Sequence, residues 1–208
     1  MNACQRDYYE ILKQSSQAAG KAGLSEKSLV AMAERVELVS YPKNAVLQEG
    51  GKVSKWMYQI ASGIVREHVL REDGIDVSIM FHEAPVGTGS LYSYENNVGS
   101  LYSLSTVTPV SAHRMSCENL SNLLSNNTEL SLWYAGLLRE NAIKMQKHII
   151  EMTCKSSEER LCYLISERPN LIKQVPSYQL ATYLNMTPVS FSRSKSNIMK
   201  KKLVVIEA

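Results

Sequence analysis

The sequence predicts an α+β protein in which short helices precede an antiparallel barrel or jelly roll, followed by a long helix and a helix-turn-helix. Three observations support this prediction. Between residues 36 and 116, short β-prone runs alternate with turn signals at a spacing of roughly ten residues. From residue 128 to 154, apolar side chains recur at helical spacing, and residues 177 to 203 contain two short helical patterns joined by a turn.

Two helices are expected before the barrel. Residues 4 to 20 place Tyr8 and Leu12 on a polar background, which is typical of a short amphipathic helix. A second helix begins near Ser25, whose hydroxyl suits an N-cap, and carries Leu29 inward.

The barrel segment is predicted to contain about eight short strands. Gly, Pro, Asn and Asp mark the turns between them, as at Pro42–Asn44, Gly50–Gly51 and Glu72–Gly74. The β-prone runs cover residues 36–39, 45–47, 56–60, 64–69, 76–81, 103–107 and 110–115.

The long helix is expected from Thr128 to about Cys154. Five apolar residues recur in it at spacings of four, three, four and three, which is a heptad pattern: Leu138, Ala142, Met145, Ile149 and Met152. Such a seam favours pairing with the same helix of another subunit, hence a homodimer. The alternative is simple packing against the barrel, and both can hold if Trp133, Tyr134 and Leu137 face the barrel.

A domain boundary is expected at residues 153 to 157, because Ser156 followed by Glu158 and Glu159 is a helix start. Arg168–Asn170 is expected to close that helix. The chain then divides into residues 1–127, the barrel with its helices; 128–154, the dimerisation helix; and 155–208, the helix-turn-helix domain.

The helix-turn-helix prediction comes from local start and stop signals. Ser177 is expected to cap the first helix, and Asn185 suits its C-terminus because Asn tolerates the left-handed conformation. Thr187 followed by Pro188 marks the start of the second helix, which directs Phe191 inward.

The second helix is cationic. From Met186 to Ile206 there is no acidic residue, while five side chains carry positive charge: Arg193, Lys195, Lys200, Lys201 and Lys202. DNA phosphates attract such a run, and a helix of this kind can enter a major groove. The alternative is an ordinary helical hairpin with a solvated basic face.

The amino-acid composition limits the classes of function that the protein can have. The chain has 208 residues, 44% of them hydrophobic and 21% charged, and a net charge of +3, too small to predict nucleic-acid binding without the local clustering. No apolar run approaches the length of a membrane span, and the N-terminal residues lack the apolar core of a signal peptide. We therefore expect a cytoplasmic protein without a membrane partner.

Catalytic and metal sites are not expected. The four cysteines (Cys4, Cys117, Cys154 and Cys162) are dispersed without a Cys-x-x-Cys pair, although a redox role for Cys154 or Cys162 stays open. Four other candidate polar residues, Asp73, Asp76, His82 and Glu83, would scatter over both faces of a strand. The sequence thus predicts neither an enzyme nor a metal protein.

The order of these elements resembles that of the Crp/Fnr family of bacterial transcription regulators. Tyr41–Gly50 and Met57–Val65 resemble segments of the family's β-roll, and Ser177–Leu203 resembles its DNA-binding motif. The resemblance implies a cyclic-nucleotide-binding-like double-stranded β-helix, a winged-helix-like DNA-binding domain and a homodimer on a palindromic duplex site, with RNA polymerase as a further candidate partner. The wing would be reduced to one strand, Lys202–Ile206.

The region that resembles the family's nucleotide pocket departs from it. Where the family has Gly-Glu and Arg-Ser, this chain has Gly89-Ser90 and Ser100-Leu101, and no arginine lies between Arg71 and Arg114. A phosphodiester pocket needs a cation, so cyclic-AMP binding is not expected. An unidentified small-molecule effector could instead be held by the residues of this region, or the loop is simply a turn; the candidates are Gly87, Thr88, Gly89, Ser90, Ser100 and Leu101. Neither haem nor an iron–sulfur cluster is expected, and no cofactor is assigned.

The resemblance also assigns DNA contacts by position. Arg193 aligns with an arginine that reads guanine, whereas Pro188-Val189 stand where the best-known activators carry Arg-Glu. The expected DNA-contacting residues are Tyr178, Thr187, Ser190, Ser192, Arg193, Ser194, Lys195 and Lys200. The sequence thus predicts a dimeric DNA-binding transcription regulator with a β-roll that senses an effector. The alternative is a ligand-binding or scaffold module of the same fold without specific DNA binding.

Overall fold

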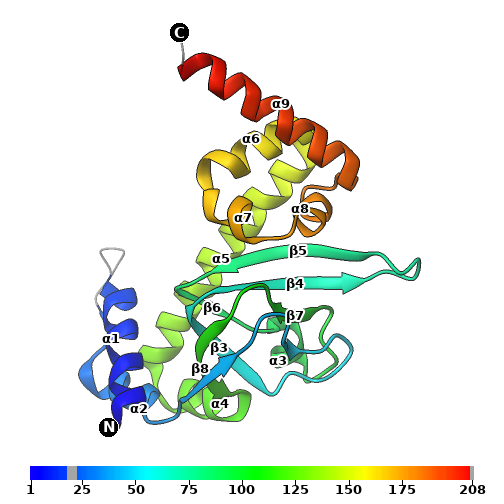
Figure 1. Ribbon diagram of the computed structural model, residues 1–208. Helices are drawn as coiled ribbons and strands as arrows, with labels where there is room; N and C mark the ends of the chain where they lie inside the picture. The colour runs from blue at the N-terminus through cyan, green and yellow to red at the C-terminus, as the bar shows by residue number, and fades with distance from the viewer. Residues whose placement is uncertain (18–22, 207–208) are drawn as a thin grey trace. The chain divides into compact units, whose positions relative to one another are not determined.

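The computed structural model describes residues 1–17 and 23–206, and side chains within these ranges as far as Ile198, apart from Gln17. The chain divides into two compact units. The first comprises Met1–Val65 and His82–Ala142, and the second comprises Arg66–Phe81 and the chain from Ile143 onward. Figure 1 shows the elements in chain order.

The first unit contains two helices before the sheets, α1 (Ala3–Gln17) and α2 (Glu26–Ala33). The Ser25 hydroxyl accepts a hydrogen bond from the Ser28 amide at 3.4 Å, so the expected N-cap of α2 is confirmed. The Glu129 carboxylate accepts hydrogen bonds from the Ser25 amide at 2.8 Å and from the hydroxyls of Ser25 and Ser28. This carboxylate therefore ties the start of α2 to the start of α5.

Eight strands are found in the described chain between residues 37 and 116, which confirms the predicted antiparallel β-fold. They are β1 (Glu37–Tyr41), β2 (Val46–Gln48), β3 (Trp56–Ser62), β4 (Ile64–Leu70), β5 (Asp76–Glu83), β6 (Val86–Thr88), β7 (Ser103–Thr106) and β8 (Val110–Ser116). Two four-stranded sheets run in the orders β1-β8-β3-β6 and β2-β7-β4-β5. Strand β4 begins in the first unit and ends in the second.

The first sheet has two differently packed faces, since side chains alternate along a strand. Tyr58, Ile60 and Ala112 lie in the interior of the roll with Val65, Leu104 and Val110. Met57 and Met115, one residue out of phase, pack in a second cluster with side chains of α1, α2 and the helices after β8. One face of the sheet therefore closes the roll, and the other supports a helical layer.

The remaining helices are α3 (Leu91–Asn96), α4 (Cys117–Asn126), α5 (Thr128–Cys154), α6 (Ser157–Glu167), α7 (Pro169–Gln174), α8 (Ser177–Tyr183) and α9 (Pro188–Ile206). Helix α5 has the range that its apolar spacing predicts. Ser156 and Glu159 form the expected capping box at the start of α6: the Glu159 amide donates to the Ser156 hydroxyl at 3.3 Å, and the Ser156 amide donates to the Glu159 carboxylate at 2.8 Å.

Arg168–Asn170 closes α6 as expected, since α6 ends at Glu167 with Arg168 as its C-cap. Pro169 then begins α7, where a proline at the first helical position loses no hydrogen bond. Two local predictions were wrong. Ser177 is not the cap of α8; it lies inside the helix, and the Pro176 carbonyl accepts the first amides. Lys202–Ile206 is not a wing strand but the end of α9, since neither Gly nor Pro interrupts the helix after Pro188.

Candidate nucleic-acid interface

The helix-turn-helix is built around a small apolar core in the second unit. Leu180 and Ala181 of α8 and Phe191 of α9 are fully buried, and so are Leu161 of α6 and Leu171 of α7. Helix α9 contacts both α8 and α6. Phe191 therefore fixes which face of α9 turns toward the protein, as the sequence predicts.

The turn between α8 and α9 has the geometry of a Schellman motif. Asn185 adopts the left-handed conformation with φ of 54°. Its amide donates to the Thr182 carbonyl at 3.0 Å, and the Met186 amide donates to the Ala181 carbonyl at 2.9 Å. The predicted role of Asn185 is confirmed, and these bonds fix the direction in which the chain leaves α8.

Helix α9 then begins as its sequence predicts. The Thr187 hydroxyl accepts a hydrogen bond from the Ser190 amide at 3.1 Å, and Pro188 occupies the first helical position. The Thr187 hydroxyl also lies 2.9 Å from the Ser190 hydroxyl. Both hydroxyls are thus engaged in the cap, and both residues stay exposed.

Arg160 of α6 holds this turn in place, a role for which the sequence gives no local signal. Its side chain is buried, and its guanidinium donates twice to the Leu184 carbonyl, at 3.1 and 2.9 Å. It also donates to the carbonyls of Met152 at 3.1 Å and Lys155 at 2.7 Å, and to the Ser157 hydroxyl at 3.2 Å. One buried cation therefore links the end of α5, the start of α6 and the turn before α9.

The second unit also contains most of the β4–β5 hairpin, and α8 lies against it. The Ser78 amide donates to the Thr182 hydroxyl at 3.1 Å, and the rings of Phe81 and Tyr183 meet edge to face at 5.2 Å. The Arg168 guanidinium donates to the Phe81 carbonyl at 2.8 Å. These contacts join β5 to the first helix of the helix-turn-helix.

An ion-pair cluster stiffens this hairpin. The buried Arg66 guanidinium donates to both carboxylate oxygens of Asp76, at 3.1 and 2.6 Å, and to the Ser78 hydroxyl at 3.0 Å. His68 Nδ1 lies 3.0 Å from Asp76. Burial raises the pKa of Asp76, but the hydrogen bonds and charge of Arg66 outweigh burial and lower it. The carboxylate therefore stays ionised beside Arg66.

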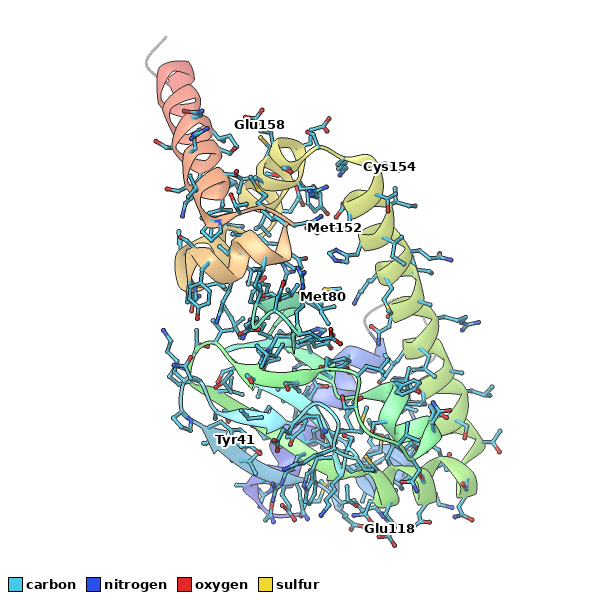
Figure 2. All side chains as sticks on the ribbon, turned by 90° about the vertical axis from the view of Figure 1, so that its right-hand side faces the viewer. Tyr41, Met80, Glu118, Met152, Cys154 and Glu158 are labelled. Atoms are coloured by element: carbon cyan, nitrogen blue, oxygen red, sulfur yellow. The ribbon has the colours of Figure 1, made fainter. Side chains whose placement is uncertain are left out.

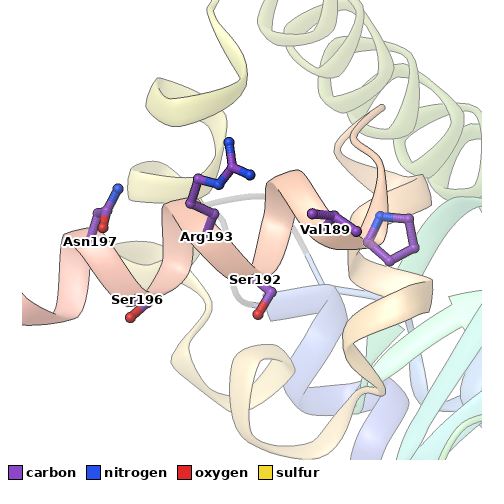
Figure 3. Close-up of a pocket in the computed structure, with 6 residues that line it drawn as sticks. Val189, Ser192, Arg193, Ser196 and Asn197 are labelled. Atoms are coloured by element: carbon purple, nitrogen blue, oxygen red, sulfur yellow. The ribbon is translucent and has the colours of Figure 1, made fainter.

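One face of α9 is open to solvent. Figure 3 shows Arg193 and Asn197 projecting from one side of this face and Ser192 and Ser196 from the other. Together with Pro188 and Val189 they line a shallow surface hollow, and all six side chains are exposed. In the part of the chain with described side chains, no carboxylate pairs with Arg193. On this face the positive charge of Arg193 is therefore not balanced by a carboxylate, and short polar side chains that can form hydrogen bonds lie beside it.

The other predicted DNA contacts lie around that face. Ser194 and Lys195 are half-buried, and Lys195 Nζ lies 5.9 Å from the centre of the Phe191 ring. Tyr178 of α8 is exposed, and its hydroxyl accepts a hydrogen bond from the side-chain nitrogen Nε2 of Gln179 at 3.1 Å. The side chain of Lys200 lies outside the described side chains. Ser196 and Asn197 were missed, although their spacing of three and four from Arg193 could have indicated them.

The predicted dimer seam lies on α5. Met145 and Ile149 are each 60% exposed, Ala142 is exposed, and Leu138 and Met152 are half-buried. The neighbouring Ile143 and Ile150 are exposed as well. Figure 2 labels Met152 and Cys154 near the C-terminal end of α5 and Glu158 in α6. The middle of this helix thus presents several large apolar side chains to solvent.

The residues predicted to hold an effector belong mainly to local structure. Ser90 is fully buried, and its hydroxyl caps α3 by accepting the Ser93 amide at 3.4 Å. The Ser100 hydroxyl donates to the Tyr102 carbonyl at 2.7 Å, whereas Leu101 is 64% exposed. Gly87 and Thr88 lie in β6, and Gly89 follows it.

In the described ranges, no helix has both the length and the apolar character required to cross a bilayer. Among the same residues, no three His, Cys, Asp or Glu side chains gather closely enough to hold a metal ion.

Solved structures share this fold. FixK2 from Bradyrhizobium japonicum aligns with a TM-score of 0.67 at 18% identity, over 80% of this chain and 86% of that chain. CLP, a c-di-GMP-responsive global regulator from Xanthomonas campestris, aligns with a TM-score of 0.68 at 15% identity, over 86% and 94%. A protein from Eubacterium rectale assigned to the Crp/Fnr family aligns with a TM-score of 0.69 at 10% identity, over 86% and 85%.

Comparison of the sequence itself gave a different outcome. Neither a scan against protein-family models nor a search among curated proteins gave a match. At these identities the structural likeness establishes the fold: the chain has the fold of the Crp/Fnr transcription regulators.

Proposed function

We propose that this protein is a DNA-binding transcription regulator that acts as a homodimer, with the exposed face of α9 as its recognition surface. The main support for the proposal is the set of exposed polar side chains on this face. Arg193, Ser192 and Asn197 project from a helix whose opposite side is anchored by the buried Phe191. Arg can bind guanine O6 and N7 through two hydrogen bonds, and Asn can bind adenine in the same way. The fold shared with Crp/Fnr regulators supports the same function.

The proposed dimer uses the seam on α5. The apolar side chains of Met145 and Ile149 lie mostly in solvent in the single chain, and a second copy of α5 would cover them. A two-fold dimer would present two α9 helices to half-sites of a palindrome about one DNA turn apart. In this proposal residues 128–154 dimerise, residues 155–208 bind DNA and residues 1–127 form the sensing domain.

The test compares Arg193→Ala with wild type on a duplex obtained by selecting binding sites from a random library. We expect the variant to lose about 1–3 kcal/mol of binding free energy and to relax the base preference at one position of each half-site. Arg6→Ala is the matched control, because Arg6 is an exposed arginine on α1. Its affinity and base preference should stay within twofold of wild type, a change of roughly 0.4 kcal/mol.

The alternative is a ligand-binding or scaffold module without specific DNA binding. It predicts that the selection enriches no palindromic site and that Arg193→Ala changes duplex binding no more than Arg6→Ala. Either result would reject the proposed recognition surface.

A further inference from the structure

A cavity in the first unit lies on the face of the first sheet that is turned away from the roll interior. Its volume is about 160 Å³. Strands β3, β6 and β8 form its floor, and side chains of α1, α2, α3, α4 and α5 form its walls. Every lining residue belongs to the first unit, so the cavity is complete within it.

The walls of this cavity are mainly aromatic and apolar. Tyr8 contributes from α1, Trp133, Tyr134 and Leu137 contribute from α5, and Met57 contributes from β3. Among its lining residues there is no Asp, Glu, Lys or Arg. A phosphate or carboxylate would therefore enter without a cation to balance it, which strongly opposes binding of an anion.

Polar atoms without partners mark one side of the cavity. His113 is 1% exposed and lines the cavity. Four buried side-chain polar atoms lack a hydrogen-bond partner in the described part of the chain, and two of them are the ring nitrogens of His113. The nearest carboxylate oxygen to His113 Nε2 belongs to Asp7, at 4.0 Å, beyond hydrogen-bond distance.

Unpaired polar groups of this kind destabilise a fold unless something binds them. The register of the sheet places His113 on the cavity face, since His113 pairs with Gln59, one residue out of phase with Tyr58 of the roll interior. Thr88 pairs with Tyr58, so its hydroxyl faces the roll interior instead. A ligand seated on this floor could therefore reach the imidazole. The imidazole can act as donor or acceptor according to its tautomer.

The volume limits the size of the occupant. An engineered apolar cavity of about 150 Å³ binds benzene, so the present cavity is suited to a molecule of one aromatic ring. We infer that this cavity is a binding site for a small, uncharged, mainly aromatic compound whose hydroxyl or amide group hydrogen-bonds to His113.

This site differs from the one that sequence predicted. Of the six predicted effector residues, only Gly87, Thr88 and Gly89 line the cavity, whereas Ser90, Ser100 and Leu101 do not. His113 and the aromatic residues of α5 were not predicted to bind a ligand. Because α5 also bears the proposed dimer seam, an occupant could affect dimerisation; that link rests on the proposed function, whereas ligand binding does not.

Three matched probes test the inference on the full-length protein: benzyl alcohol, toluene and benzoate. The first two differ in one hydroxyl group, and benzoate adds a negative charge to the same ring. Isothermal titration calorimetry should show saturable binding of benzyl alcohol, about tenfold weaker binding of toluene, as for loss of one net hydrogen bond, and no binding of benzoate.

One variant locates the site. His113→Phe removes the ring nitrogens while keeping much of the volume, so it should reduce the preference for benzyl alcohol over toluene. It should also raise the melting temperature of the unliganded protein, because a buried unpaired group is gone. Thr153→Val is the control, since Thr153 is exposed on α5 in the second unit, and it should leave both affinities unchanged.

The inference is overturned by any of three results: no saturable binding of benzyl alcohol, equal binding of toluene or benzoate, or an unchanged preference in His113→Phe. None of these results depends on DNA, so failure here would leave the proposed DNA-binding function standing. Conversely, loss of DNA binding in Arg193→Ala should not change the affinity for benzyl alcohol.

Discussion

Replacing Arg160 by Met should destabilise the second unit by about 3 kcal/mol. Met keeps an apolar stem of similar length but removes the guanidinium and its five hydrogen bonds. The largest contribution comes from the Leu184 carbonyl, which loses both of its donors next to a buried side chain. An unsatisfied buried acceptor costs about 1–3 kcal/mol. The carbonyls of Met152 and Lys155, where α5 ends, are half-buried and add less.

Urea unfolding followed by far-ultraviolet circular dichroism measures this loss, with a lower midpoint and an unchanged slope. A loss of about 3 kcal/mol corresponds to a melting temperature lower by roughly 6–12 °C in a chain of this size. Amide hydrogen exchange gives a local check, because the amides of Asn185 and Met186 should exchange faster once the turn is released.

Arg139→Met is the matched control, since Arg139 is exposed on α5. It should change the free energy of unfolding by no more than about 0.5 kcal/mol. If Arg160→Met costs less than about 1 kcal/mol, or if exchange at Asn185 and Met186 does not change, the buried network does not hold the turn.

Met145→Asp combined with Ile149→Asp should give monomers in analytical ultracentrifugation while Lys147→Asp stays dimeric; a dimer in the double variant would place the interface elsewhere. Burial lowers the pKa of His148 and of His113, so below about pH 6.5 the unfolded chain binds more protons than the folded chain. The free energy of unfolding should therefore fall as pH drops from about 7 to 5. A free energy of unfolding that does not change over this pH range would contradict this. Thr182→Val removes the hydroxyl that accepts the Ser78 amide and should destabilise the second unit by about 1–3 kcal/mol in urea unfolding, whereas unchanged stability would mean that this contact contributes nothing.

The sequence predicted the elements whose signals are local. Asn185, Thr187 and Pro188 mark the turn because each suits its position through its own backbone preference or side-chain cap, and the structure has them in these roles. The turn-punctuated β-prone runs likewise predicted the antiparallel sheets. Such features depend on residues within a few positions of one another.

Long-range arrangements could not be predicted in this way. Arg160 binds carbonyl oxygens, which every residue possesses, so no residue type in the sequence points to its partners. His113 lies at the cavity because β8 pairs with β3, which depends on residues far apart in the sequence. The error at Lys202–Ile206 has the opposite origin: the β-branched residues near the end favour a strand, but the helix started at Pro188 meets no stop signal and continues.

Whether α9 binds DNA is best tested by the affinity of the full-length protein for duplex DNA, measured as a function of salt concentration. The logarithm of the binding constant should fall linearly as the logarithm of salt concentration rises, because cations on α9 displace counterions from the phosphates. Duplex binding that is absent at low salt, or whose strength does not change with salt, would contradict the claim that this cationic helix binds DNA.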